Sequence, residues 1–376
     1  MFDRTQATVD GAATARLARW AEAVVADPAD AARGLDAVTP WWLPGGNLQT
    51  IWSAIGARRH FGAKPRWQRQ RWDTPDQDFI DVDVFDDGST TTNNNSSSET
   101  DDRPLLVLFH GLEGSSSSQY AVAFADFAQT HGVAMAVPHF RGCSGELNVA
   151  PRAYHSGDFA EVDWILTRFR RQHPHRTMVA AGVSLGGNAL LRWAGEMGEA
   201  AATRVKAVAA ICSPLDLASG GHAIGQGFNR LVYTRMFLNT MVPKALDKWA
   251  QHPGLFDRDA LLSAKDLYAF DNVFTAPLHG FENTEDYWSR ASAKPVLADI
   301  RIPALALNAR NDPFVPAASL PREGEVGKHV SLWQPRRGGH VGFPGSLPPW
   351  GVPGHVRSMP EAVGQWLLAH AGCARG

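Results

Sequence analysis

Residues 177–195 read Thr-Met-Val-Ala-Ala-Gly-Val-Ser-Leu-Gly-Gly-Asn-Ala-Leu-Leu-Arg-Trp-Ala-Gly. A short apolar run ends at the centre of this stretch and a helix-like run begins, and Gly182–Gly186 fits G-x-S-x-G. A serine on such a strand-to-helix turn stands exposed above a sheet, and the following helix points N–H groups at charge that develops during acyl transfer. Because the short pattern also arises by chance in a chain with 35 glycines, the interpretation of Ser184 as a nucleophile depends on the rest of the chain.

Length and composition exclude several classes of protein. With 376 residues the chain can bury a large core, as one domain with an insertion or as two domains. A net charge of −2 provides no basic field for nucleic acid, and the basic run at 168–176 is typical of a solvated helix terminus. The three cysteines are too few and too scattered for a disulfide framework or a zinc site, so we expect no metal.

Neither a secretory signal nor a membrane span is predicted. The first residues include Asp3 and Asp10 and no apolar segment. The best apolar runs, such as Leu105–Phe109, have the length of a strand. We therefore expect a cytoplasmic protein without a transmembrane segment, for which peripheral contact with a membrane stays open.

Short apolar runs alternate with helix-like runs from Pro104 onwards. The pattern predicts strands at Leu105–Phe109, Val133–Val137, Met178–Ala181, Val205–Ile211, Ala304–Leu307 and Val330–Trp333. It predicts helices at Ser118–Thr130, Asp158–Arg171, Leu185–Met197 and Glu361–His370. Such alternation is typical of a mostly parallel central sheet with helices on both faces, so we assign the chain to the α/β class.

The part of the chain before this pattern is interpreted as an extension. Residues 1–66 are expected to pack on a main domain of residues 67–376. Within the extension, residues 11–27 have apolar positions at helical spacing, and the aromatic, glycine-rich residues 40–52 are interpreted as packing against the main domain.

Three other segments depart from the strand–helix alternation. Residues 66–86 alternate in polarity around a turn, which predicts an antiparallel hairpin. Residues 88–102 are rich in Ser, Thr, Asn and Asp and are interpreted as an extended loop. Between about 216 and 295 the alternation is lost and aromatic residues are frequent, which predicts a helical cap inserted over the active site.

The segment His110–Gly114 directly follows the predicted strand at 105–109. In a nucleophile-elbow architecture, a glycine-containing turn at this place supplies one backbone N–H of the oxyanion hole, and the residue after the nucleophile supplies the other. We assign these donors to Leu112 and Leu185. His110 precedes the turn and is interpreted as a hydrogen-bonding support rather than as a base.

The acid and the histidine of such a site follow the nucleophile in the chain, with the histidine last. Asp312 comes directly after the predicted strand at 304–307, where open α/β sheets place their sites. Asp216 follows the preceding strand and is the alternative acid, although it could equally cap a helix. His340 lies in a glycine-rich loop after the last strand, so we expect Asp312 to orient His340 and His340 to deprotonate Ser184.

Two further motifs are interpreted as structural. Phe140–Glu146 follows a strand and predicts a tight turn under the site, and Cys143 is not expected to be a nucleophile because no elbow surrounds it. Tyr154–Asp158 opens a predicted helix, where His155 and Asp158 are expected to have a positioning role.

With these residues assigned, the chain resembles the YheT-like α/β-hydrolases from Pro40 to the terminal helix. The motifs that carry the resemblance lie at residues 47–50, 74–76, 110–114, 141–145, 154–158, 184–188, 275–281, 311–314 and 339–343. The resemblance implies an α/β-hydrolase fold, hydrolysis of acyl esters or lipids, and Ser184, Asp312 and His340 as charge-relay residues. Residues 89–99 depart from the family pattern, and the membrane attachment of the eukaryotic relatives is not implied because no anchor segment is present.

These observations together predict a serine hydrolase that cleaves carboxylic esters through a Ser-His-Asp triad and an acyl-enzyme, without a metal or cofactor. The expected partner is a small-molecule or lipid acyl ester, and neither nucleic acid nor an obligate protein partner is indicated. Two alternatives stay open: acyl transfer to an alcohol at the same site, and a non-catalytic binding module with a hydrolase fold. Fold alone does not determine the acyl length, the leaving group or the oligomeric state.

Overall fold

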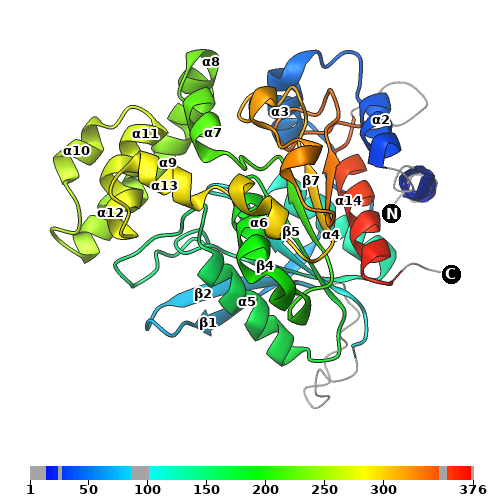
Figure 1. Ribbon diagram of the computed structural model, residues 1–376, viewed down its shortest axis with the longest axis horizontal. Helices are drawn as coiled ribbons and strands as arrows, with labels where there is room; N and C mark the ends of the chain where they lie inside the picture. The colour runs from blue at the N-terminus through cyan, green and yellow to red at the C-terminus, as the bar shows by residue number, and fades with distance from the viewer. Residues whose placement is uncertain (1–13, 24–27, 87–100, 347–353, 374–376) are drawn as a thin grey trace, which may run out of the picture.

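The structure, a computed structural model, describes residues 14–23, 28–86, 101–346 and 354–373. Within these residues, eight strands form one sheet in the order β1-β2-β4-β3-β5-β6-β7-β8 (Figure 1). Both pairings of β2 are antiparallel, and all the others are parallel. The strands are β1 (Arg66–Asp73), β2 (Phe79–Asp86), β3 (Leu105–Phe109), β4 (Ala134–Pro138), β5 (Met178–Val183), β6 (Val208–Ile211), β7 (Ala304–Leu307) and β8 (Val330–Trp333). The predicted α/β class with a mostly parallel sheet is confirmed.

Helices cover both faces of the sheet. They include α4 (Gln119–His131), α5 (Phe159–Gln172), α6 (Leu185–Met197) and α14 (Ser358–His370). Leu106 and Leu108 of β3 belong to one apolar cluster with residues of α4 and α14. Their neighbours Leu105, Val107 and Phe109 belong to a second cluster with residues of α5 and α6. Successive side chains of a strand point to opposite faces, so this run of buried residues requires a layer of helices on each side.

Most of the predicted boundaries hold to within a few residues. The hairpin at 66–86 is confirmed as β1 and β2, with Trp72 paired to Ile80. The strand predicted at 205–211 begins only at Val208, because Val205 and Ala207 are buried before the regular strand starts and an apolar pattern cannot tell burial from pairing. Residues 88–100 of the predicted loop lie outside the described residues, as do residues 11–13 and 24–27 of the first predicted helix, of which 14–23 are helical.

Two helices near the N-terminus were not predicted. Helix α2 (Pro28–Val38) packs against β8 and α14, and α3 (Gly45–Ile55) occupies the stretch interpreted only as packing. Helix α3 begins with two glycines, which are poor helix formers, and buries the polar side chains of Gln49 and Ser53. Tertiary contacts therefore override local propensity in this segment. The division between residues 1–66 and the rest remains our prediction.

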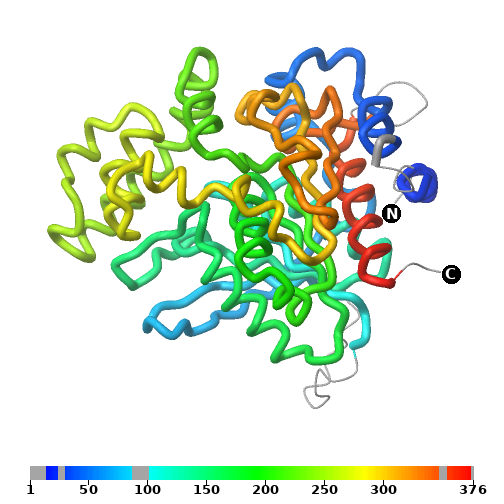
Figure 2. The backbone as a smooth tube through the Cα atoms, viewed as in Figure 1, coloured from blue at the N-terminus to red at the C-terminus, as the bar shows by residue number. Residues whose placement is uncertain are grey.

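Between β6 and β7 the chain leaves the sheet and forms a series of helices, of which all but α9 are short. They are α7 (Leu217–Ile224), α8 (Gly227–Asn229), α9 (Arg235–Gln251), α10 (Arg258–Ser263), α11 (Leu267–Phe270), α12 (Ala276–Leu278) and α13 (Thr284–Ala291). In the tube view, this yellow-green segment forms a lobe at the left of the sheet (Figure 2). We call residues 216–295 the cap segment, and its bounds as a unit remain our prediction.

Candidate active site

Ser184 lies between the last residue of β5 and the first residue of α6. Its backbone has φ 53° and ψ −119°, a left-handed conformation that is strained for a residue with a side chain. A Cβ on Gly186 would meet the carbonyl oxygens of Phe109 and His110, so glycine is required there for the helix to pass close to β3. The turn is thus the strand–turn–helix that the sequence predicted, with the serine at its apex.

The structure brings His340 and Asp312 to this serine. His340 Nε2 lies 3.0 Å from Ser184 Oγ, and His340 Nδ1 lies 2.9 Å from Asp312 Oδ2. The second carboxylate oxygen of Asp312 accepts the N–H of Phe314 at 2.8 Å, and the Phe314 ring packs against His340 with centroids 4.2 Å apart. The side chain of Asp312 is fully buried, so these hydrogen bonds hold its carboxylate in one orientation.

Asp216, the alternative acid, has a different partner. Its carboxylate accepts the N–H of Ser219 at 3.0 Å and caps the N-terminus of α7. Asp312 is the residue whose carboxylate hydrogen-bonds His340. Of the two acids weighed from the sequence, the geometry therefore favours Asp312.

The two predicted oxyanion donors, Leu112 and Leu185, line the same pocket as Ser184 and His340. Leu185 is the first residue of α6, where backbone N–H groups have no partner within the helix. Among the described residues, no acceptor takes the N–H of Leu112. Gly111 is different, because its N–H donates to the Tyr120 hydroxyl at 2.9 Å and fixes the turn. Leu112 and Leu185 can thus both present N–H groups to a ligand.

His110 and Cys143 are both buried. Burial lowers the pKa of His110 to about 3, so the ring is neutral. Its Nδ1–H donates to the Gly111 carbonyl at 2.8 Å and its Nε2 accepts the N–H of Phe140 at 3.0 Å. These contacts match the supporting role expected of His110. Burial raises the pKa of the Cys143 thiol to about 12, which leaves no thiolate to act as a nucleophile.

Helix α3 holds the loops of both the acid and the histidine. The hydroxyl of Thr50 accepts the N–H of His340 at 2.8 Å. The side-chain oxygen of Gln49 accepts the N–H of Gly338 at 2.8 Å and the amide of Asn311 at 3.0 Å. Sequence reasoning missed this role. The only signal for it was the presence of the polar residues Asn47, Gln49 and Thr50 inside an aromatic stretch.

Cys212, Asp312 and His340 offer three potential ligand atoms within 4.8 Å of one another. The Cys212 sulfur accepts the N–H of Val341 at 3.1 Å, and burial raises the pKa of the thiol well above its usual range. Metal ions bind the thiolate rather than the thiol. The hydrogen bonds of this group therefore fit a histidine oriented by an acid better than a metal site.

The pocket above Ser184 comprises about 720 Å³, part of which is open to solvent, and has a predominantly apolar wall. Part of that wall is Pro214 and Phe314 from the main domain. The cap segment supplies six further apolar side chains, Leu217, Ile224, Phe237, Met241, Leu267 and Trp288. A second pocket of about 580 Å³ adjoins the first and shares Leu112 and Leu185 with it. Both pockets thus meet at the candidate oxyanion donors.

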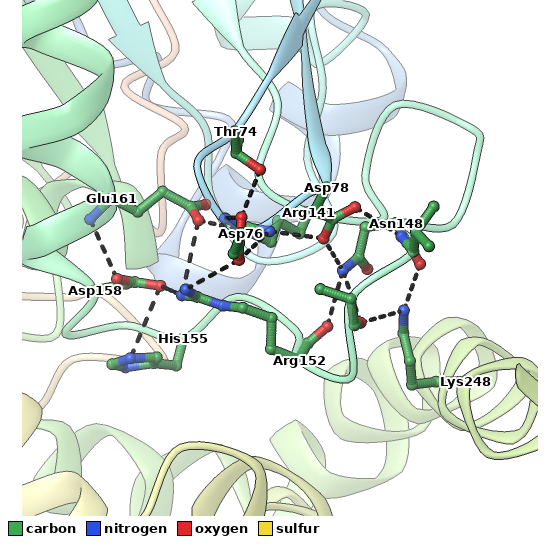
Figure 3. Close-up of polar contacts among 12 residues, drawn as sticks. Thr74, Asp76, Asp78, Arg141, Asn148, Arg152, His155, Asp158, Glu161 and Lys248 are labelled. Atoms are coloured by element: carbon green, nitrogen blue, oxygen red, sulfur yellow. Dashed lines mark hydrogen bonds and ion pairs between the residues drawn. The ribbon is translucent and has the colours of Figure 1, made fainter. Parts of the chain in front are cut away.

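Figure 3 shows a network of charged side chains, and two of its cations, Arg141 and Lys248, line the second pocket. Arg141 donates to Glu161 and to Asp78, each at 2.6 Å, and its side chain is only 4% exposed. Asp158, the cap residue of α5, pairs with Arg152 and accepts the N–H of Glu161. The network contains more carboxylates than arginines. Burial and the charge of Asp158 accordingly raise the pKa of Glu161 to about 7.

The same network connects three parts of the chain. Asp78 precedes β2, Arg141 follows β4, and Lys248 of α9 donates to the carbonyls of Asn148 and Ala150 (Figure 3). His155, which lines the second pocket, lies 3.9 Å from Asp158. Burial lowers the pKa of His155 to about 3, so it is neutral, consistent with the positioning role expected for this pair.

Replacing Arg141 by methionine should destabilise the fold by about 3–5 kcal/mol, because it leaves buried carboxylates without their shared cation. Urea unfolding of the Arg141→Met variant measures this loss. Glu161→Gln is the matched control and should cost much less. It should also remove the fall in stability of the wild type as pH rises from about 4.5 to about 7. Over this range the unfolded chain loses the proton of Glu161 while the folded protein still holds it. A loss below 1 kcal/mol for Arg141→Met would contradict this account.

None of the described helices is long and apolar enough to cross a membrane. The α/β hydrolase fold family matches residues 104–345. Among curated proteins, the chain is 35% identical to the Escherichia coli protein named "Putative esterase YheT", over 80% of this chain and 84% of that protein. It is 28% identical to human phospholipase ABHD3 over 78% of this chain and 72% of that one.

A third relative is the monoacylglycerol lipase of Saccharomyces cerevisiae, at 27% identity over 65% of this chain and 55% of the yeast protein. The family match spans more than half of the chain, and the Escherichia coli relative aligns over most of both proteins. The chain therefore belongs to the α/β-hydrolase family and, within it, to the YheT-like members.

Proposed function

We propose that this protein is a serine hydrolase that cleaves carboxylic esters through an acyl-enzyme intermediate. The observation that carries the proposal is the chain of hydrogen bonds from Asp312 through His340 to Ser184, which opens into an apolar pocket. A nucleophile, a base and an orienting acid within hydrogen-bond reach of one another are the parts that acyl transfer requires.

In the proposed acylation step, Ser184 Oγ attacks the ester carbonyl carbon while its proton passes to His340 Nε2. The carbonyl oxygen becomes an oxyanion, which the N–H groups of Leu112 and Leu185 stabilise. One such donor contributes on the order of 3 kcal/mol. The bond to the alcohol oxygen then breaks, and His340 returns the proton to the departing alcohol. Water attacks the acyl-enzyme by the same sequence, which releases the carboxylic acid and restores the serine.

The proposed substrate is an ester with an apolar acyl or alcohol part, such as a lipid. The apolar side chains of the cap segment support this choice, because burial of each methylene contributes about 0.8 kcal/mol to binding. The names of the relatives (esterase, phospholipase, monoacylglycerol lipase) all describe enzymes acting on esters. We also propose that residues 216–295 act as the cap that closes this pocket.

Hydrolysis of p-nitrophenyl esters of increasing acyl length tests the proposal. Since about 0.8 kcal/mol per buried methylene corresponds to about fourfold, kcat/KM should rise by up to that factor per methylene until the pocket is full. In the variant Ile224→Phe, which fills part of the pocket, the rise should stop at a shorter chain while acetate hydrolysis stays close to that of the wild type.

A series without dependence on chain length would contradict the assignment of the pocket. Absence of hydrolysis with every ester, together with ester synthesis from an added alcohol, would favour the alternative of acyl transfer. Ester binding without turnover in either direction would favour a non-catalytic binding module.

A further inference from the structure

Glu113 directly follows Leu112, the first candidate oxyanion donor. It has φ 56°, and a left-handed backbone is uncommon for a residue with a long side chain. Such a conformation is unfavourable by itself and persists only where the surrounding structure holds it. The contacts of Glu113 therefore decide whether the N–H of Leu112 stays in place.

Tyr154 holds both the backbone and the side chain of Glu113. The N–H of Glu113 donates to the Tyr154 hydroxyl at 3.1 Å, and that hydroxyl donates to Glu113 Oε1 at 2.9 Å. Burial raises the pKa of Tyr154 well above its usual range, so the hydroxyl keeps its proton for this bond. The Tyr154 ring is itself stacked on Phe140, with centroids 5.5 Å apart. One rigid side chain thus closes a small hydrogen-bonded ring around Glu113.

Lys244 from the cap segment supplies the ion-pair partner of Glu113, whose Oε1 also accepts the Cys143 thiol at 3.9 Å. Its ammonium group lies 2.8 Å from Glu113 Oε2. The side chain of Glu113 is 10% exposed and that of Lys244 is 37% exposed, and both residues line the second pocket. Without Lys244 the largely buried carboxylate would lose its ion-pair partner and keep only the uncharged donors Tyr154 and Cys143. It would then rotate toward water, and the ring with Tyr154 would open.

We infer that Lys244 is a positioning residue for ester hydrolysis, because its ion pair with Glu113 fixes the oxyanion turn at Leu112. The inference rests on the proposed function, since it presumes that Leu112 stabilises an oxyanion. It assigns to helix α9 a second task besides lining the pocket: the cap segment has to be in contact with Glu113 for the oxyanion hole to be complete. The position of the Leu112 N–H therefore depends on the contact between the cap segment and Glu113.

An ordinary ion pair at the pocket rim would behave differently. A partly exposed pair of that kind contributes little to stability, and its loss would leave the chemical step unchanged. A positioning role predicts instead that the variant stabilises the transition state less well, because the oxyanion exists there, while it binds the substrate as before. Separate measurement of kcat and KM therefore distinguishes a positioning residue from an ordinary ion pair.

The experiment compares Lys244→Met with the wild type, using p-nitrophenyl acetate because its acyl group is short and Lys244 lines the second pocket rather than the pocket that contains Ser184. Loss of an oxyanion donor lowers kcat by about 10²–10³-fold, so its displacement should lower kcat by about tenfold, with KM within about twofold. The affinity for an aryl trifluoromethyl ketone, which forms an oxyanion on Ser184, should fall by the same factor as kcat/KM. Lys244→Arg should restore kcat to within about threefold, since it keeps the ion pair.

Two controls complete the design. Arg235→Met removes a cation from the exposed start of the same helix and should leave kcat unchanged. Glu113→Gln should lower kcat as Lys244→Met does, and the double variant should be no worse than either single one, because all three break the same contact.

Wild-type kcat and ketone affinity in Lys244→Met would overturn the inference while leaving the proposed function intact. Equal decreases in kcat for Lys244→Met and Arg235→Met would overturn the inference as well. If the wild type and Ser184→Ala turn over the ester at the same rate, the proposed function fails, and the inference fails with it.

Discussion

Ser184→Ala should abolish ester hydrolysis, with kcat lower by about 10⁶-fold, the size of loss that follows removal of the nucleophile of an intact triad. In the proposed mechanism the effect is large because His340 then has no hydroxyl to deprotonate and the oxyanion donors have no tetrahedral intermediate to stabilise. The measurement is initial-rate hydrolysis of the best p-nitrophenyl ester, with purified protein at matched concentrations.

The fold should tolerate this change. Alanine has the same Cβ as serine, so the left-handed backbone at residue 184 keeps its strain, and only the hydrogen bond to His340 is lost. The thermal midpoint is therefore expected to lie within a few degrees of the wild-type value, which corresponds to about 1 kcal/mol. A folded alanine variant that retained a tenth or more of the activity would show that the nucleophile is another residue.

Asp312→Asn should lower kcat by about 10⁴-fold. Asp312 Oδ1 accepts the N–H of Phe314, so the amide nitrogen of asparagine would face His340 Nδ1. An N–H at this place favours the imidazole tautomer that carries its proton on Nε2. That tautomer cannot accept the proton of Ser184, and the base is lost although the ring stays in place.

Asp216→Asn is the matched comparison for this prediction. Asn caps helices about as well as Asp, so α7 should keep its N-terminus and hydrolysis should stay close to the wild-type rate. The pH-independent kcat of both variants, measured with the same ester, decides between the two acids. Inactivation by Asp216→Asn with an active Asp312→Asn would reverse the assignment.

The part of the fold that the sequence predicted best is the sheet. Leu105–Phe109 and Met178–Val183 are short apolar runs without a polar interruption, and both are central parallel strands buried on both faces. The error at the start of β6 arises because Val205 is apolar and buried although it precedes the strand. A run of apolar residues predicts that the side chains are buried, but it does not show which of them pair with a neighbouring strand.

The candidate site was predictable to the extent that its residues sit at fixed places in the topology. Ser184 follows β5 and Asp312 follows β7, and the carboxyl ends of parallel strands meet at one edge of a sheet. Helix α3 and the contact between Lys244 and Glu113 could not be predicted in this way. These contacts join residues far apart in the chain, Thr50 with His340 and Lys244 with Glu113, and no local pattern encodes such pairs.

Local periodicity and chain order therefore determined by themselves the α/β sheet, the elbow around Ser184 and the loops of Asp312 and His340. Only the tertiary structure decided which acid hydrogen-bonds His340, how α3 supports the two loops and how the cap segment contacts the oxyanion turn. The physical reason is that strand burial and tight turns are set by neighbours in the sequence. Hydrogen bonds between loops depend instead on how segments that are distant in the sequence are positioned in the folded structure.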